Sequence, residues 1–137
     1  MSSALDAVVV VPRRRREDGR GWLHVALDAS DVGDDRFGEL YLVQSARRGD
    51  RRGDHYHREA TEWFSVAEGA ARLELMDPAT GERRAVQLRA DEPSAVRVPA
   101  GVAHCFVNAT DAPLLVVAWS TEEHDPADVV ACSTAGP

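Results

Sequence analysis

Two histidines separated by a single residue, His55-Tyr56-His57, begin the stretch of sequence that could do chemistry. Because side chains alternate between faces along a β-strand, both imidazoles would point to one side and Tyr56 to the other. Residues 58–61 then separate His57 from Glu62, a length that suits a hairpin loop. The next strand would return beside the first, which places Glu62 next to the histidine pair.

A later stretch supplies a third imidazole. It follows the turn at residues 99–101, and His104, Phe106 and Asn108 share one face of the strand. If this face points inward, three imidazoles and one carboxylate converge. Zinc, iron, manganese and nickel ions all accept such ligands, so we expect a site for a divalent metal ion, with zinc as the first choice. Its ligands would be His55, His57, Glu62 and His104.

A histidine on a strand is more often a surface group than a ligand, and we interpret His24 and His124 in that way. The combination of an H-x-H pair, a glutamate at hairpin distance and a later P-x-G-x-x-H turn favours one common site. The same residues could also form a metal-free acid–base site, and that alternative stays open.

The elements that must position these residues are strands. Short apolar runs separated by Gly, Pro, Asp and Asn recur along the chain, and no window has a long helical pattern, which is typical of an all-β sandwich or barrel. The predicted strands are Val8–Val11, Trp22–Leu27, Phe37–Gln44, Arg52–His57, Glu62–Ala67, Ala71–Met76, Ala85–Leu88, Ala95–Val98, His104–Asn108 and Leu114–Ser120.

Length and composition indicate one globular domain over residues 1–137, because 44% of the residues are hydrophobic and 28% are charged. We expect the barrel core at about residues 37–120 and a frayed tail at 133–137. The net charge of −7 argues against nucleic-acid binding. All 16 basic residues are arginine, so no lysine is present to form a Schiff base with a substrate or cofactor.

Two further features predict a cytoplasmic protein without a membrane partner. No apolar run is long enough to span a bilayer, and the first residues lack the pattern of a signal peptide. The cysteines, Cys105 and Cys132, do not form a C-x-x-C motif, and we expect them to be reduced.

The same residues match both signature motifs of the cupin superfamily, which the chain resembles. The first motif, G-x5-H-x-H-x4-E-x6-G, is matched by Gly49, His55, His57, Glu62 and Gly69. The second, P-x-G-x2-H-x3-N, is matched by Pro99, Gly101, His104 and Asn108. Pro93 replaces the glycine that usually opens the second motif. The resemblance implies an all-β cupin jelly-roll barrel, or double-stranded β-helix.

Residues 51–84 and 96–130 further resemble cupins that act on sugar nucleotides. The C-terminal cupin domain of bifunctional capsular-polysaccharide enzymes shares the H-Y-H, T-E, T-G-E and D-P motifs, binds zinc and epimerises a UDP-linked 4-keto deoxy sugar. The dTDP-4-keto-6-deoxyhexose 3,4-ketoisomerases carry R-G-x-H-x-H, matched by Arg52, Gly53, His55 and His57. The dTDP-4-dehydrorhamnose 3,5-epimerases are similar through R-G-x-H-Y, although His57 replaces a residue that is not histidine there.

This resemblance implies an epimerase or ketoisomerase that removes and returns a proton next to the ketone of a nucleotide-linked 4-keto-6-deoxy sugar. His55 would be the base in the isomerase and epimerase families and a zinc ligand in the capsular one, and both roles stay open. We assign catalytic roles to His55, His57 and Tyr41. Tyr41 lies where the ketoisomerases carry an active-site tyrosine, and its hydroxyl could return the proton.

The diphosphate of such a substrate needs cations, and arginine suits phosphate well. Arg52 belongs to the R-G motif, and three more arginines crowd the same segment. We therefore expect Arg52, Arg48 and Asn108 to bind the substrate. The resemblance and the open edges of a short jelly roll also predict a homodimer, in which residues 8–11 pair with or cover the partner.

Two other functions stay open. The same ligands could hold Fe(II) in a dioxygenase-type cupin, and measurements of metal identity and oxygen uptake would reveal it. A non-catalytic cupin could instead bind a sugar or another small molecule. It would not exchange protons of a bound keto sugar with solvent.

Overall fold

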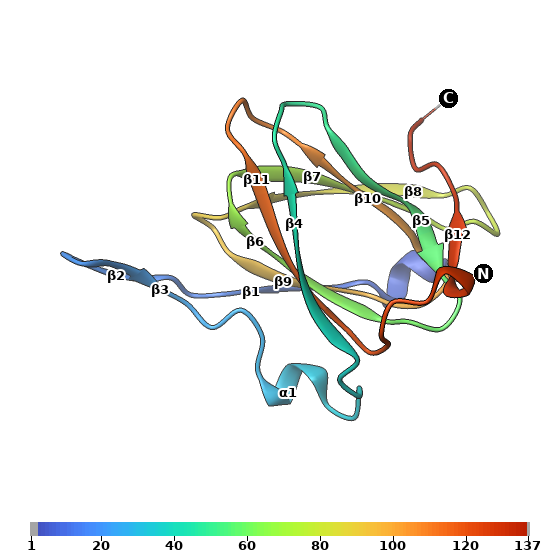
Figure 1. The fold of residues 1–137 in the computed structure, drawn as a ribbon, viewed down its shortest axis with the longest axis horizontal. Helices are drawn as coiled ribbons and strands as arrows, with labels where there is room; N and C mark the ends of the chain where they lie inside the picture. Colours follow the sequence, from blue (N-terminus) through green and yellow to red (C-terminus); the bar gives the residue numbers. More distant parts are fainter. Residues whose placement is uncertain (1–2, 137) are drawn as a thin grey trace.

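The computed structural model describes residues 3–136, which form a barrel of two five-stranded antiparallel sheets (Figure 1). In spatial order, the first sheet contains β1 (Val9–Pro12), β9 (Ser94–Val98), β6 (Glu62–Glu68), β11 (Leu114–Ser120) and β4 (Glu39–Ser45). The second contains β12 (Val129–Ala131), β5 (Arg51–His57), β10 (Ala103–Asn108), β7 (Ala70–Met76) and β8 (Arg83–Arg89). The predicted all-β jelly roll is confirmed.

The core lies between the two sheets and follows from the alternation of apolar residues. In β11, Leu114, Val116 and Ala118 are buried, while the residues between them are partly exposed. The rings of Phe64 and Phe106 meet edge to face across the core with their centroids 4.8 Å apart. Such a pair adds about 0.5–1.5 kcal/mol to the burial of its area, and it joins β6 to β10 directly beneath the site described below.

The segment before the barrel differs from the prediction. A strand over Trp22–Leu27 is wrong, because β3 (Gly21–Leu23) ends after three residues and pairs only with β2 (Arg16–Asp18). This hairpin projects away from the barrel (Figure 1), so the chain beyond it has no neighbouring strand. Asp28 then caps a short helix, α1 (Ala29–Val32), through a capping box with Asp31.

The other predicted strands are present, and their observed ends differ from the predicted ends by at most two residues. Besides α1, four elements were not predicted: β2, the turn η1 (Ala4–Ala7), the turn η2 (Pro126–Asp128) and β12. The strand predicted at Val8–Val11 is β1, and it pairs with β9 of its own chain. None of the helices in residues 3–136 is long and apolar enough to cross a membrane.

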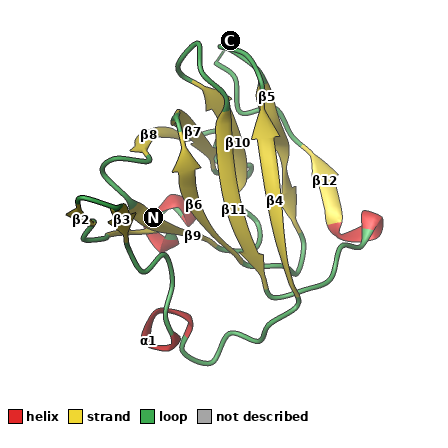
Figure 2. Cartoon of the chain, turned by 60° about the vertical axis from the view of Figure 1, so that its left-hand side comes forward, coloured by secondary structure: helices red, strands yellow, loops and turns green. Residues whose placement is uncertain are grey.

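The segment after β11 closes one edge of the barrel. β12 pairs with β5 and lies at the edge of the second sheet (Figure 2). The expected frayed tail does not describe Thr134, which is only 3% exposed. Its backbone N–H donates to Asp54 and its carbonyl accepts from Arg83. Pro137 lies outside the described residues.

Candidate active site

A β-bulge in β5 directs the first two imidazoles into the barrel. His55 lies opposite His104 of β10, and Gly53 lies opposite Cys105, so Asp54 is an extra residue in β5. Gly53 has a φ of 126°, and a Cβ at this position would lie 2.5 Å from the carbonyl oxygen of His104. Glycine therefore permits the close approach of β5 to β10 that brings the histidines together.

The structure brings the three predicted imidazoles together. The ring centroid of His55 lies 5.1 Å from that of His57 and 5.0 Å from that of His104. One nitrogen from each ring falls in a set whose members lie within 4.8 Å of one another. Because Nδ1 of His104 donates to the carbonyl of Val102 over 3.1 Å, its Nε2 is left to face the cluster.

Glu62 joins this cluster through two of the three rings. Its Oε1 lies 2.8 Å from Nε2 of His57 and 3.8 Å from Nε2 of His104. Although the first distance is short, neither Nε2 of His57 nor Oε1 of Glu62 has a hydrogen-bond partner with proper geometry among the described residues. Buried polar atoms without partners are costly, and a shared cation would bind the lone pairs of both atoms. The donor set therefore fits a divalent metal ion.

Tyr41 reaches the same carboxylate from two strands away in the same sheet. Its hydroxyl donates a hydrogen bond to Oε2 of Glu62. Tyr41 is on β4, and Glu62 is on β6, with β11 between them. The predicted tyrosine is thus at the site, while Tyr56 alternates to the other face of β5 from the histidines that flank it.

Asp128 is a site residue that the sequence analysis missed. Its Oδ2 accepts a hydrogen bond of 3.1 Å from Nδ1 of His57, and its carboxylate also accepts from the backbone N–H groups of Glu59 and Ala60. Asp128 is the last residue of η2. The N-cap of this turn is Asp125, and its first residue is Pro126. That capping pattern was the available signal for a turn, but nothing in it pointed to His57.

The charges of the cluster are set by burial and by Glu62. Burial, and then the charge of His57, lower the pKa of His55. Burial lowers the pKa of His104 to about 4. Burial also opposes the charge of His57, but contacts with Glu62 and Asp128 outweigh it and leave the pKa of His57 raised. The site therefore holds two neutral imidazoles beside one that favours a proton.

The same environment shifts the pKa values of Glu62 and Tyr41. Burial would raise the pKa of Glu62, but His57, His104 and Tyr41 stabilise the carboxylate, and its pKa is lowered overall. Burial first, and then the charge of Glu62, raise the pKa of Tyr41, so its hydroxyl keeps its proton. Tyr41 is thus a hydrogen-bond donor and Glu62 an anion near neutral pH.

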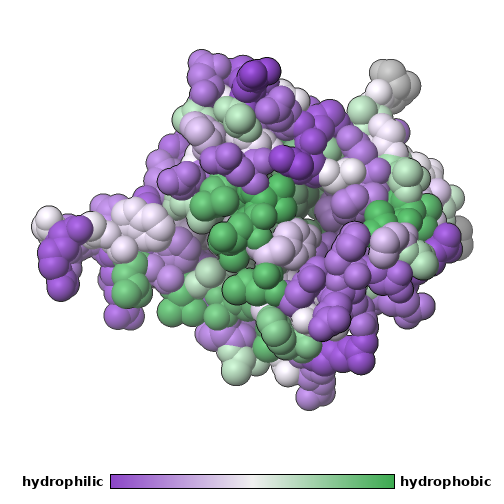
Figure 3. Space-filling view, in the orientation of Figure 1, coloured by the Kyte–Doolittle hydropathy of each residue, from purple (hydrophilic) through white to green (hydrophobic). Residues whose placement is uncertain are grey.

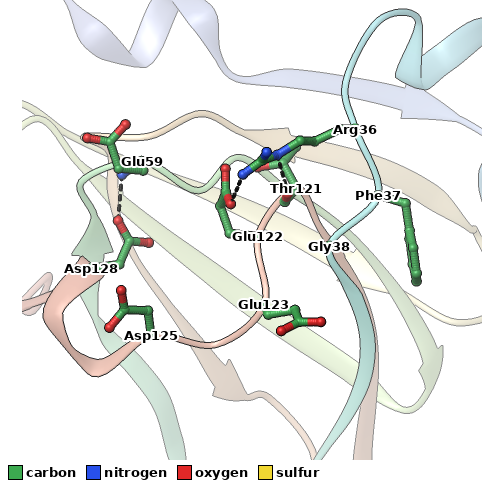
Figure 4. Close-up of a pocket in the computed structure, with 9 residues that line it drawn as sticks. All are labelled: Arg36, Phe37, Gly38, Glu59, Thr121, Glu122, Glu123, Asp125 and Asp128. Atoms are coloured by element: carbon green, nitrogen blue, oxygen red, sulfur yellow. Dashed lines mark hydrogen bonds and ion pairs between the residues drawn. The ribbon is translucent and has the colours of Figure 1, made fainter.

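The cluster opens into a cavity of about 400 Å³. Tyr41, His55, His57 and Glu62 line its inner end. A second cavity of about 570 Å³ adjoins it and shares part of its lining (Figure 4). Carboxylates dominate the common rim, and among residues 3–136 Arg36 is the only arginine that lines either cavity, where it pairs with Glu122. The rim carboxylates that line both cavities are Glu122, Glu123, Asp125 and Asp128, while Glu39 lines only the first cavity and Glu59 only the second.

The residues predicted to bind substrate do not line these cavities. Arg48 pairs with Asp111 and donates to the carbonyl of Ala109. The guanidinium of Arg52 donates to the carbonyl of Gln44, at the end of β4 away from Tyr41. Asn108 is buried, and its side-chain amide donates to two carbonyls of the chain and so holds the turn that follows β10.

A jelly-roll barrel with an H-x-H pair, a glutamate and a later histidine facing its interior defines a cupin. Within that class, residues 16–130 match the family model described as the polysaccharide biosynthesis C-terminal domain, and the chain belongs to this family. It is also 29% identical over 118 residues to the UDP-2-acetamido-2,6-beta-L-arabino-hexul-4-ose reductase of Pseudomonas aeruginosa. The match covers 85% of this chain and 30% of that protein, so the chain spans less than a third of this relative's length.

Solved structures with this fold include enzymes of sugar-nucleotide metabolism. A 3'-monoepimerase from Streptomyces bikiniensis in complex with dTDP superposes with a TM-score of 0.84 at 20% identity, over 96% of this chain and 70% of that chain. A dTDP sugar isomerase from Desulfovibrio desulfuricans superposes with a TM-score of 0.85 at 21% identity, over 100% of this chain and 90% of that one. At these identities the likeness establishes the fold.

Proposed function

We propose that this cupin is an epimerase or ketoisomerase of a nucleotide-linked 4-keto-6-deoxy sugar. The observation that carries the proposal is the cavity whose inner end holds His55, His57 and Glu62 with the hydroxyl of Tyr41. A neutral imidazole and a protonated phenol in one cavity supply the base and the acid that proton transfer next to a ketone requires. The names of the enzymes with the same fold, which include 3'-epimerases and 3,4-ketoisomerases, support this substrate class.

His55 is the proposed base. It is half-buried, lines the cavity and has a lowered pKa, so it is neutral and able to take a proton near neutral pH. Tyr41 is the proposed acid, because its raised pKa keeps the hydroxyl protonated until a carbanion or enolate forms. In the metal-free site, His57 is the positively charged neighbour, held by Glu62 on one side and Asp128 on the other.

We further propose that His55, His57, Glu62 and His104 can hold a divalent ion, with zinc as the first candidate. The close set of imidazole nitrogens and the unpartnered atoms of His57 and Glu62 support this. The two roles of His55 are alternatives, because an imidazole nitrogen that binds a metal has no lone pair left to take a proton. A bound ion would act as a Lewis acid toward the substrate ketone. In that case Asp128 would fix the tautomer of His57 through Nδ1, which is the usual role of a carboxylate behind a metal-bound histidine.

The experiment is proton exchange with solvent. UDP- and dTDP-linked 4-keto-6-deoxy sugars are incubated with the protein in deuterated water, and the ring carbons beside the ketone are followed by NMR. We expect exchange with the wild type, and a loss of about a hundred- to ten-thousand-fold in His55→Asn. His24→Asn is the matched control, because His24 stacks on Trp22 in the projecting hairpin region and lines neither cavity.

The Tyr41→Phe variant tests the proposed acid independently of the proposed base. It keeps the ring and removes the hydroxyl that donates to Glu62. We expect it to retain the first exchange step and to lower the yield of product or change which product forms. If metal-loaded wild-type protein exchanges no ring proton in any of these substrates, the proposed function is wrong. Oxygen uptake with Fe(II) would then test the dioxygenase alternative.

We also propose that the protein is a homodimer that uses the outer face of the first sheet. Leu40 and Leu42 of β4 are 61% and 66% exposed, which is unusual for leucines on a strand. Apolar residues gather over β4 and β11 in the space-filling view (Figure 3). Leu42→Glu should convert the dimer to a monomer by light scattering, whereas Gln87→Glu on the other sheet should not. A monomeric wild type at micromolar concentration would contradict the proposal.

A further inference from the structure

The bulge in β5 reverses which residues point into the barrel. Arg52 lies opposite Phe106, and His55 lies opposite His104, so both belong to the inner face of the sheet, although the Arg52 side chain is exposed. In a regular strand, residues three apart point to opposite faces. Without the extra residue at Asp54, His55 would therefore point out of the barrel. The orientation of the proposed base depends on this one backbone irregularity.

Asp54 has a backbone conformation that its residue type does not prefer. Its φ is 54°, and it is the only non-glycine residue in positions 3–136 with a positive φ. Such a conformation costs of order 1–3 kcal/mol and persists only where the surroundings enforce it. The chain must therefore supply contacts that hold Asp54 in place.

Those contacts come from the segment after β12. The N–H of Cys132 donates to the carbonyl of Asp54 over 2.8 Å. The N–H and the hydroxyl of Thr134 both donate to Oδ1 of Asp54, over 3.1 and 3.2 Å. Arg51 makes two further bonds to the same carboxylate. Backbone and side chain of Asp54 are thus bound on the outer side of the sheet, opposite the cavity.

Thr134 is buried and makes hydrogen bonds to two further strands. It is 3% exposed, its hydroxyl lies 3.1 Å from Oε1 of Glu74, and its carbonyl accepts from Arg83 over 2.6 Å. Glu74 is on β7 and Arg83 begins β8, so the contact ties three strands of the second sheet to the segment after β12. A buried threonine at this position acts as a fixed point against which Asp54 is held.

We propose that Thr134 and Asp54 are positioning residues for His55: together they lock the bulge that directs its imidazole to His57 and His104. This inference rests on the proposed function for the choice of His55 as the reacting group. The orientation of the ring can be measured without substrate or metal. Failure of the inference and failure of the proposed function are therefore distinguishable.

The test compares two pairs of variants. Asp54→Gly allows the positive φ but removes the side-chain anchor, whereas Asp54→Asn tolerates that φ and keeps an acceptor for Thr134. Thr134→Val removes the hydroxyl at nearly constant shape, and Thr134→Ser keeps it. Asp91→Asn, which breaks a surface pair with Arg89, is the control. The readout is the nuclear Overhauser effect between the rings of His55 and His104, whose centroids lie 5.0 Å apart.

We expect this ring contact in the wild type, in Asp54→Asn, in Thr134→Ser and in the control. It should be lost or strongly weakened in Asp54→Gly and Thr134→Val, while the amide spectrum of the barrel stays folded. For active protein, kcat of proton exchange should fall about ten- to a hundred-fold in those two variants, with KM unchanged, and the conservative variants should restore it. An unchanged ring contact in both Asp54→Gly and Thr134→Val would overturn the inference.

The possible results distinguish the positioning role of Thr134 and Asp54 from the proposed reaction. If the wild type exchanges no proton of any keto sugar but the ring contact follows the expected pattern, the positioning role stands and the proposed reaction fails. A folded Thr134→Val variant in which the contact persists refutes the role of the hydroxyl whatever the activity. Should Asp54→Gly fail to fold, the Thr134 pair alone decides, because valine preserves the volume of the buried side chain.

Discussion

Nδ1 of His57 donates to the carboxylate of Asp128 over 3.1 Å, a contact between residues 71 positions apart in the sequence. The bond fixes which nitrogen of His57 faces the cavity, because the other nitrogen must then point toward Glu62. It also joins the turn η2 to β5, so the wall of the cavity and the histidine pair form one connected unit.

Asp128→Asn should weaken binding of zinc about 10- to 100-fold, since the amide cannot stabilise a proton on Nδ1 as a carboxylate does. Competition with a coloured chelator measures this affinity. Asp111→Asn is the control, because Asp111 pairs with Arg48 away from the cavities. An Asp128→Asn protein that binds zinc as tightly as the wild type would remove the role assigned to this carboxylate.

Gly53→Ala should destabilise the protein more than Gly49→Ala. Both glycines have a positive φ, of 126° and 87°, so alanine is strained at either position. Only at Gly53 would the new Cβ collide with a neighbouring strand, at the carbonyl of His104. We expect about 1–3 kcal/mol from the conformation alone at each site, and a further loss at Gly53. Urea denaturation followed by circular dichroism measures both, and equal losses would contradict the proposed contact.

Glu74→Gln should destabilise the protein near neutral pH and have little effect in acid. Burial would raise the pKa of Glu74, but hydrogen bonds from Arg51 and Thr134 outweigh it and lower that pKa. A lowered carboxyl pKa contributes stability that is present above the pKa of the unfolded chain and is lost as the pH falls through the folded value. The difference in unfolding free energy between wild type and variant should therefore narrow from about pH 7 to about pH 3. A gap that stays constant with pH would contradict this.

The rate of proton exchange should persist into mildly acidic solution. A base acts in its neutral form, so the rate falls as the pH drops through its pKa. Because the pKa of His55 is lowered by burial and by the charge of His57, the fall should occur below about pH 6.5, the value for a free imidazole. The measurement is kcat/KM for exchange across this range. A midpoint above the value for a free imidazole would exclude His55 as the base.

The spacing of polar residues was enough to predict the inner part of the site. His55, His57 and His104 share a face because of strand alternation, and Glu62 follows at hairpin distance. Their mutual proximity in the structure confirms that geometry. The strand pattern was reliable where both flanking strands pair along their length, as in β11. It failed within Trp22–Leu27, because the pairing with β2 ends at Leu23.

The outer part of the site could not be predicted in the same way. Asp128 reaches His57 only because η2 folds back against the loop at residues 58–61, a tertiary contact with no local signature. Arg48 lies near the histidines in sequence, yet it is engaged by Asp111 and the carbonyl of Ala109 and lines neither cavity. The bulge at Asp54 is likewise invisible in a residue pattern, because it depends on Thr134.

The acidic rim of the cavities determines how the association rate of a charged ligand depends on ionic strength. A nucleotide sugar carries a negatively charged diphosphate, and the carboxylates of residues 122–128 repel it at long range in the isolated chain. The Debye length shrinks from about 30 Å at 0.01 M salt to about 8 Å at 0.15 M. Added salt should therefore speed the arrival of such a ligand at this subunit, the reverse of the usual behaviour of proteins that attract phosphates through basic surfaces.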